Sequence, residues 1–178
     1  MKFESPTTQR VMFLTGLIVT VLADQISKLY IRISVPEGAW RNIIPGCVAI
    51  THRLNQGIAL SFFHHINAAP VIFSLIALGA VGFITWLVIR HPMLPRKVII
   101  ALGLIGGGAA GNMIDRIIPP HKVVDFIDCY AGTLHWPAFN IADSAICIGA
   151  GLLVLASFTD PQAFSRPASS PPVSSETI

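Results

Sequence analysis

Charged residues are scarce in this chain of 178 residues, of which only 12% are Asp, Glu, Lys or Arg. Soluble domains carry about 25% charged residues, so the composition argues against a soluble protein. The net charge is only +3, and no run of basic residues resembles a nucleic-acid-binding patch. With 53% hydrophobic residues and a mean hydropathy of +0.67, the chain falls in the membrane class, where phospholipids are its surroundings.

Cysteines and metal-binding motifs are also scarce. The three cysteines form no CxxC motif and no even framework, although Cys47 and Cys129 could pair if both faced an oxidising compartment. The histidines include no HExxH motif and no Cys/His cluster at zinc-ligand spacing. We therefore expect neither a metal nor another cofactor.

Four apolar stretches have about the length that crosses 30 Å of hydrocarbon as a helix. The predicted fold is an all-α membrane protein with four transmembrane helices, in one domain that covers residues 1–160. Residues 161–178 are rich in Pro and Ser and predict a disordered tail. The spans are expected over residues 11–33, 68–89, 98–114 and 139–158.

The polar segment 34–67 predicts a small sheet that rests on the membrane, because it combines turn residues with short β-prone pieces at 42–44 and 47–54. The aromatic residues expected at headgroup level are Trp40, Phe62, Phe63 and, in a later loop, Trp136. The basic loop from Arg90 to Lys97 is cytoplasmic by the positive-inside rule. Both termini are then cytoplasmic, and residues 34–67 and 116–138 lie outside.

The first span has two interpretations. Residues 11–23 resemble the core of a signal peptide with a cleavage site after Ala23. However, the helical pattern continues through Asp24 and Lys28, which are four residues apart and therefore lie on one helix face, where they can neutralise each other. A structural ion pair is the simpler interpretation of Lys28.

Glycines recur in the third span. Gly103, Gly107 and Gly111 follow the small-xxx-small pattern that lets membrane helices approach closely. Gly106, Gly108 and Gly111 also satisfy GxGxxG, but a dinucleotide site would need alternating strands and helices around it, and this chain has long spans instead.

Acidic residues lie beside apolar runs in the second half of the chain. A carboxylate at the edge of hydrocarbon is costly and marks a candidate functional site. Asp143 lies one turn into an apolar helix, where Asn140 is the better N-cap. Asp125 competes with Asp115, which could pair with other charges, and with Asp128, which could be solvated.

Two neighbouring carboxylates share one proton, so one can activate water while the other polarises a carbonyl group. Asp125 and Asp143 are the predicted pair, which would perform aspartic-protease chemistry without a metal or a covalent nucleophile. A low-dielectric setting strengthens their coupling.

Five segments together resemble the motif set of the lipoprotein signal peptidases (signal peptidase II). They are DQISK (24–28), NQGIALS (55–61), GGAAGNMIDR (107–116), VVDFID (123–128) and FNIADSAI (139–146). The resemblance implies a protease of the bacterial inner membrane with four spans and an extracytoplasmic β-cradle. It would cleave prolipoproteins before their diacylglyceryl-modified cysteine, act as a monomer and be inhibited by globomycin.

The resemblance also assigns residues. It implies that Asp125 and Asp143 are catalytic, and that the supporting positions are Asn55, Asn112, Arg116, Asn140, Asp24, Asp115 and Lys28. Two departures are Leu60, where the family has Phe, and the Pro119-Pro120 pair, which makes the loop before Asp125 slightly longer.

Two other functions remain as alternatives. A Ser/Lys peptidase would use Lys28 as its base, with Ser27 or Ser61 as nucleophile, but adjacent helical residues do not face each other. A proton-coupled carrier would use Asp24 and Asp143 as relays.

Overall fold

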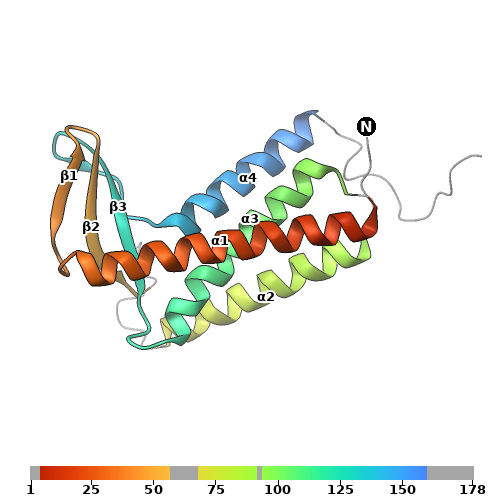
Figure 1. Cartoon of the computed structure of the whole chain (residues 1–178), viewed down its shortest axis with the longest axis horizontal. Helices are drawn as coiled ribbons and strands as arrows, with labels where there is room; N and C mark the ends of the chain where they lie inside the picture. Colours follow the sequence, from red (N-terminus) through yellow and green to blue (C-terminus); the bar gives the residue numbers. More distant parts are fainter. Residues whose placement is uncertain (1–4, 57–67, 92–93, 160–178) are drawn as a thin grey trace, which may run out of the picture.

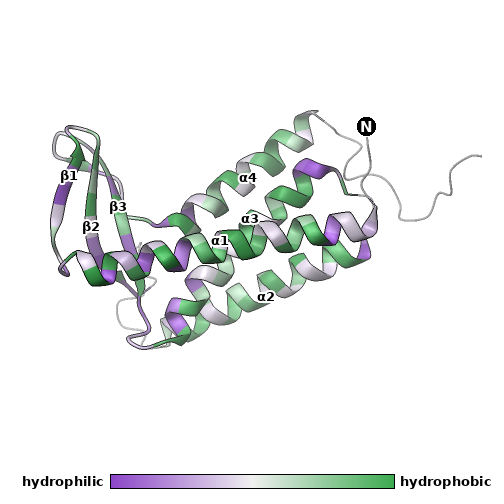
Figure 2. Ribbon diagram, in the orientation of Figure 1, coloured by the Kyte–Doolittle hydropathy of each residue, from purple (hydrophilic) through white to green (hydrophobic). Residues whose placement is uncertain are grey.

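Four helices run side by side in the computed structural model, and a small sheet covers one end of them (Figure 1). The structure describes residues 5–56, 68–91 and 94–159; Leu60, Phe62, Phe63 and the predicted tail lie outside these ranges. Each helix is long and apolar enough to span a membrane, and hydrophobic residues dominate all of them (Figure 2). The predicted four-helix fold with a small sheet is confirmed. The helices are α1 (Pro6–Ser34), α2 (Ala69–Arg90), α3 (Arg96–Ile117) and α4 (Ile141–Thr159).

Helix α1 is one continuous helix that passes through Ala23 without a break. It begins where the Ser5 side chain accepts a hydrogen bond from the Thr8 backbone N–H at 3.1 Å, with Pro6 at the first helical position. Both features favour a helix start, because they satisfy or remove an N–H group that has no helical partner.

Helix α3 is the central helix. In its most apolar 18-residue stretch, 61% of the residues are buried inside the protein. The buried share of the corresponding stretch is 22% or less in each of the other three helices. Its glycines explain why: a Cβ on Gly107 would lie 2.6 Å from Cβ of Thr20, and one on Gly111 would lie 2.6 Å from Oδ2 of Asp24. The small-xxx-small interpretation is confirmed, and the GxGxxG match lies inside this helix and not at a strand-to-helix turn.

The sheet has four antiparallel strands in the order β1-β2-β3-β4. The prediction covered only the first two, and it missed β3 and β4. Strand β3 carries VVDFID, whose residues are nearly all buried, so it lacks the polar alternation that marks a half-exposed strand. The strands are β1 (Trp40–Ile44), β2 (Val48–Asn55), β3 (Val123–Ala131) and β4 (Leu134–His135).

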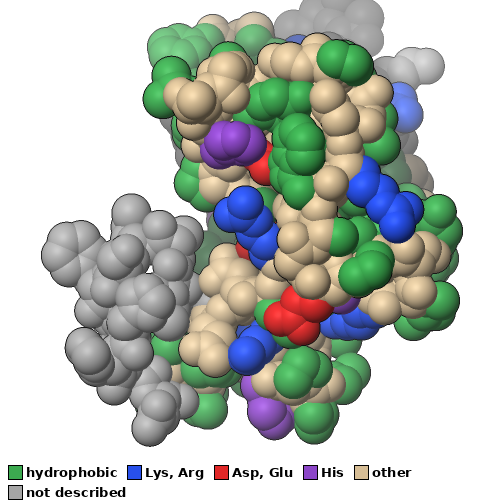
Figure 3. Space-filling view, turned by 90° about the vertical axis from the view of Figure 1, so that its left-hand side faces the viewer, with side chains coloured by type: hydrophobic (Ala, Val, Ile, Leu, Met, Phe, Trp, Pro, Cys, Tyr) green, Lys and Arg blue, Asp and Glu red, His purple; other side chains and the backbone are tan. Residues whose placement is uncertain are grey.

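A small apolar cluster joins the sheet to the helices. Ile31 and Val35 at the end of α1 pack with Val124 and Phe126 of β3. The outer face of the sheet shows Lys and Arg side chains dispersed among hydrophobic and uncharged ones, over the part of this face that is described (Figure 3). The cluster fixes where β3, and therefore Asp125, sits over the helix ends.

The cysteine pairing considered from the sequence does not form. Cys47 and Cys129 are both free, as is Cys147. Val48, and not Cys47, is the cross-strand partner of Cys129, and Cys47 lies in the turn before β2.

Substitution of Gly107 by Ala should destabilise the protein by about 1 to 3 kcal/mol, because the new methyl group would overlap Thr20 and the Leu17 carbonyl oxygen at 2.7 Å. Gly82→Ala in α2 is the matched control, since no atom lies within 4 Å of its added Cβ. Unfolding midpoints in detergent would measure both effects. Equal midpoints for the two variants would contradict the close approach of α1 and α3.

Candidate active site

Two acidic side chains from different elements lie at the sheet end of the bundle. Asp125 lies on β3 and is only 4% exposed, and Asp143 lies in the first turn of α4 and is half-buried. The strand and the helix are joined by a short segment in which Phe139 pairs with Ile127. This pairing turns the chain back toward the bundle, so the two acids approach the same residues.

Asn140 contacts both acids. Its side-chain Nδ2 donates to Oδ1 of Asp125 at 2.8 Å, and its Oδ1 accepts the Asp143 backbone N–H at 3.0 Å. In return, the Asn140 backbone N–H donates to Oδ2 of Asp143 at 3.2 Å. This is a reciprocal capping box, so the N-cap that starts α4 also ties the two acids together.

Two further asparagines complete the contacts. Asn55 of β2 donates to Oδ2 of Asp125 at 2.9 Å, and Asn112 of α3 donates to Oδ1 of Asp143 at 2.8 Å. Each of the four carboxylate oxygens therefore accepts a hydrogen bond. Amide donors hold a carboxylate in place while adding no charge of their own.

The surroundings favour a proton on Asp125. Burial raises the pKa of its carboxyl group from 3.8 to about 6, and the negative charge of Asp143 also raises it. Hydrogen bonds from Asn55 and Asn140 act in the opposite direction and lower this pKa. An acid with this pKa can hold and release a proton near neutral pH, as a general acid or base must.

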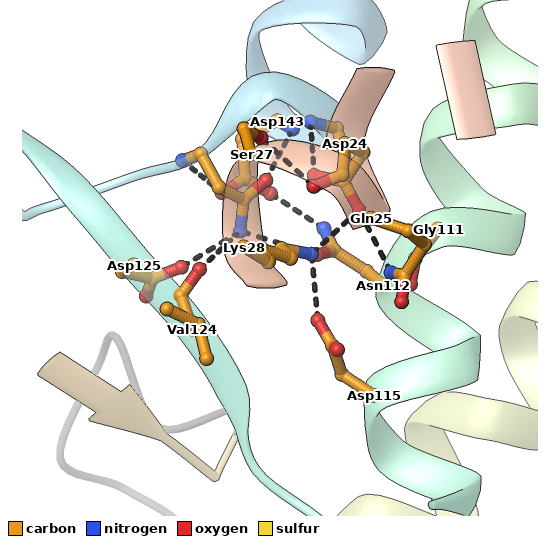
Figure 4. A network of polar contacts seen from close by, with 12 residues as sticks. Asp24, Gln25, Ser27, Lys28, Gly111, Asn112, Asp115, Val124, Asp125 and Asp143 are labelled. Atoms are coloured by element: carbon orange, nitrogen blue, oxygen red, sulfur yellow. Dashed lines mark hydrogen bonds and ion pairs between the residues drawn. The ribbon is translucent and has the colours of Figure 1, made fainter. Parts of the chain in front are cut away.

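A buried ion cluster lies next to the acids. Nζ of Lys28 is 2.7 Å from Oδ2 of Asp24 and 2.7 Å from Oδ2 of Asp115, and all three side chains are essentially inaccessible (Figure 4). Arg32 pairs with the other oxygen of Asp115 at 2.6 Å. Oδ1 of Asp24 accepts the Ala142 backbone N–H at 3.0 Å, so the cluster connects α1, α3 and α4.

The ion pair predicted between Asp24 and Lys28 is therefore present, and Asp115 pairs with charges, as its alternative interpretation proposed. Sequence reasoning did not assign Arg32 a partner. The available signal was its spacing, since Arg32 lies four residues after Lys28 and thus on the same face of α1.

Arg116 links the last turn of α3 to α2. It donates to the Asn112 carbonyl oxygen at 3.0 Å, and its guanidinium group lies 5.4 Å from the ring centre of Phe73 in α2. Its charge interacts with both Asp143 and Asp125. Arg116 thus places a positive charge beside the two acids while it holds α2 against α3.

Asp128 is not solvated, contrary to the interpretation considered for it. It is 1% exposed and accepts hydrogen bonds from Nε1 of Trp40 at 2.9 Å and Nδ1 of His135 at 3.0 Å. Because it lies three residues after Asp125 on one strand, it faces the other side of the sheet. Asp128 therefore stabilises the sheet away from the two acids.

The described residues contain no group of three or more His, Cys, Asp or Glu side chains that could hold a metal ion.

A family profile described as signal peptidase (SPase) II matches residues 16–159. The chain belongs to this family. It is accordingly a multi-pass membrane enzyme, a peptidase of the aspartic type.

Curated relatives agree with the family assignment over most of the chain. A lipoprotein signal peptidase of Maridesulfovibrio salexigens is 38% identical over 80% of this chain and 94% of its own length. A protein of the same name from Cupriavidus taiwanensis is 40% identical, with 84% of each chain covered.

Two solved structures, both described as bacterial membrane enzymes, share the fold. One has a TM-score of 0.74 over 96% of this chain and 99% of its own, at 24% identity. The other has a TM-score of 0.73 over 86% of this chain and 94% of its own, at 28% identity.

The raised pKa of Asp125 predicts a pH dependence of stability. An acid with a higher pKa in the folded state binds its proton preferentially when folded, so the free energy of unfolding falls as the pH rises from about 4 to about 6. Asp125→Asn carries no charge and should avoid this loss, which is at most about 3 kcal/mol. Unfolding in detergent near pH 4 and near pH 8 would measure the difference between the two proteins. A difference that stays constant with pH would contradict the prediction.

The two roles of Asn140 can be separated. Asn140→Ser keeps an oxygen that caps α4 but removes the donor to Asp125, whereas Asn140→Ala removes both. The Ala variant should be less stable than the Ser variant by about 1 kcal/mol, with both impaired in catalysis. Thermal unfolding and a peptidase assay on the same preparations would test this, and equal stability would argue against the cap.

Proposed function

We propose that this protein removes the signal peptide of diacylglyceryl-modified prolipoproteins by cleaving just before the lipidated cysteine, with Asp125 and Asp143 as the catalytic pair. The observation that carries the proposal is the contact of Asn140 with both acids, which places them around one spot at the outer end of α4. The family of the chain and the names of its relatives support the substrate class.

The proposed mechanism is general acid–base catalysis by the pair. The ionised carboxylate takes a proton from water, and the water oxygen forms a bond to the scissile carbonyl carbon. The protonated carboxyl group meanwhile donates to the carbonyl oxygen, where negative charge develops. When the tetrahedral intermediate collapses, the C–N bond breaks and the amine leaves with a proton supplied by the pair. The pKa of Asp125 supports its ability to hold that proton near neutral pH.

The supporting residues have defined tasks in this proposal. Asn55, Asn112 and Asn140 hold the carboxylates in position, and Arg116 adds positive charge at a site that carries two acids. The buried ion cluster next to the two acids holds α1 and α3 together. It consists of Lys28, Asp24, Asp115 and Arg32. Fixed donors of this kind need no rearrangement as the reaction proceeds.

The orientation in the membrane follows from the two ends of the bundle. Arg90 and Arg96 flank the loop at one end, and the two acids lie at the other, beneath the sheet. We propose that the basic end and both termini are in the cytoplasm of a bacterial inner membrane and that the site faces outward. A substrate anchored by acyl chains would then reach a monomeric enzyme by lateral diffusion through phospholipid.

The contacts of Lys28 argue against a Ser/Lys peptidase. Its ammonium group contacts Asp24, Asp115 and the Asn112 side-chain oxygen, so its three N–H groups already have partners. The Ser27 hydroxyl donates to the Asp24 carbonyl oxygen at 2.8 Å and is not directed at Lys28. Ser61 lies outside the described residues; Ser61→Ala with unchanged cleavage would eliminate it as a nucleophile.

Replacement of either acid by Asn should abolish processing while the protein remains folded in the membrane. A lipidated precursor incubated with purified Asp125→Asn or Asp143→Asn should stay uncleaved, with a rate loss of at least about 1,000-fold. Globomycin should block the wild-type protein in the same gel-shift assay.

Asp128→Asn is the matched control for these variants, because Asp128 is a buried acid on the same strand that faces away from the pair. It should lower stability but retain cleavage. Full processing by the Asp125→Asn or the Asp143→Asn variant would remove the substituted residue from the catalytic pair, and ion flux without proteolysis in liposomes would favour the carrier.

A further inference from the structure

The side-chain amide of Asn112 has a fixed direction. Its Nδ2 donates to Oδ1 of Asp143 at 2.8 Å, and its Oδ1 accepts from Nζ of Lys28 at 2.8 Å. Nδ2 of Asn140 also donates to this Oδ1, at 3.2 Å. Only this direction lets Asn112 donate to Oδ1 of Asp143, because the two ends of an amide have opposite hydrogen-bonding character.

We infer that Lys28 is a positioning residue for the reaction, which acts through Asn112 by holding the amide with its N–H toward Asp143. This inference rests on the proposed function of the Asp125–Asp143 pair. It gives Lys28 a task beyond the neutralisation of Asp24, which its spacing in the sequence indicates, and of Asp115, which the structure adds.

Lys28 holds the Asn112 amide in this direction because the rotated amide would make two unfavourable contacts. Rotation of Asn112 by half a turn would direct its N–H groups at the Lys28 ammonium and its oxygen at the Asp143 carboxylate. Both contacts would be repulsive in a buried setting, where electrostatic interactions are strong. A bond from a charged donor is also stronger than one between neutral groups, so the ammonium selects one direction.

The neighbouring amide of Asn140 needs no such cation. Its Oδ1 caps α4 by accepting the Asp143 N–H, so its Nδ2 necessarily points at Asp125. Helix capping thus directs the donor to one acid and Lys28 directs the donor to the other. The two means are linked by the Asn140 Nδ2 donor, which also reaches Oδ1 of Asn112 at 3.2 Å, but the charged donor on that oxygen is Lys28.

The charges around Asp143 come from several elements. Arg116 of α3 and Asp125 of β3 interact with it directly. Lys28 of α1, paired with Asp24 and Asp115, is separated from it by the Asn112 side chain. The Lys28 charge is compensated at contact distance by Asp24 and Asp115, so the direct field that it exerts on Asp143 is reduced. The charge of Lys28 also acts directly on Asp125, whose pKa it lowers, whereas its effect on Asp143 is carried by the Asn112 amide.

The test compares Lys28→Met with Arg32→Gln in a cleavage assay on a lipidated precursor peptide. Both variants remove one positive charge from the same cluster on α1, but only Lys28 touches Asn112. Lys28→Met should lower kcat about 10- to 100-fold with KM nearly unchanged, because one hydrogen bond to a charged group is lost. It should also move the acidic limb of the kcat profile to higher pH, because the ionised form of the Asp125–Asp143 pair loses a hydrogen bond that stabilises it.

A double-mutant cycle isolates the route through Asn112. In an Asn112→Ala background, Lys28→Met should cost no more than about 3-fold in kcat, because the amide that it directs is absent. If the Lys28→Met variant does not fold, Asp24→Asn combined with Lys28→Met removes the pair without leaving an uncompensated charge, with Asp24→Asn alone as its reference.

Additive losses in the cycle, or an equal shift of the pH profile in Arg32→Gln, would overturn the inference and leave Lys28 a structural residue. Those results require a wild-type protein that cleaves the precursor. Absence of cleavage by the folded wild-type protein would instead overturn the proposed function itself.

Discussion

A carboxylate at the boundary between hydrocarbon and water must receive hydrogen bonds, or its burial costs more than the fold can offset. This requirement governs the end of the bundle that the sheet covers. Asp125 and Asp143 receive donors from β2, α3 and the N-terminus of α4, so three separate elements must meet there before either acid can be buried. The geometry of the site therefore depends on the packing of the helices and the sheet.

The close approach of the helices depends on what α3 lacks. Gly107 and Gly111 allow Thr20 and Asp24 of α1 to reach the α3 backbone, and Gly108 does the same for Ala142 at the start of α4. A side chain at any of these positions would separate the helices that carry the ion cluster and the capping asparagine. The glycines of α3 thus determine how closely the charged residues of α1, α3 and α4 approach one another.

The sequence indicated the two candidate acids with unequal clarity. Asp143 stood out because an acid inside an apolar helix has few structural explanations, and Asn140 was recognised as the N-cap beside it. Asp125 could not be separated from Asp115 and Asp128 by pattern, because β3 lacks alternation and was not recognised as a strand. Once the strand is known, the three-residue spacing places Asp128 on the opposite face, and the motif resemblance had selected the same member, Asp125.

The sequence by itself determined the membrane class, the four apolar spans, the Asp24–Lys28 pair and the glycine face of α3. These features depend on composition and on helical periodicity, which are local properties of the chain. Only the tertiary structure decided which donors meet which carboxylates, that Asp128 faces Trp40 and His135, and that Lys28 reaches Asn112. Such contacts join residues as many as 118 positions apart, and no local pattern encodes the direction of an amide group.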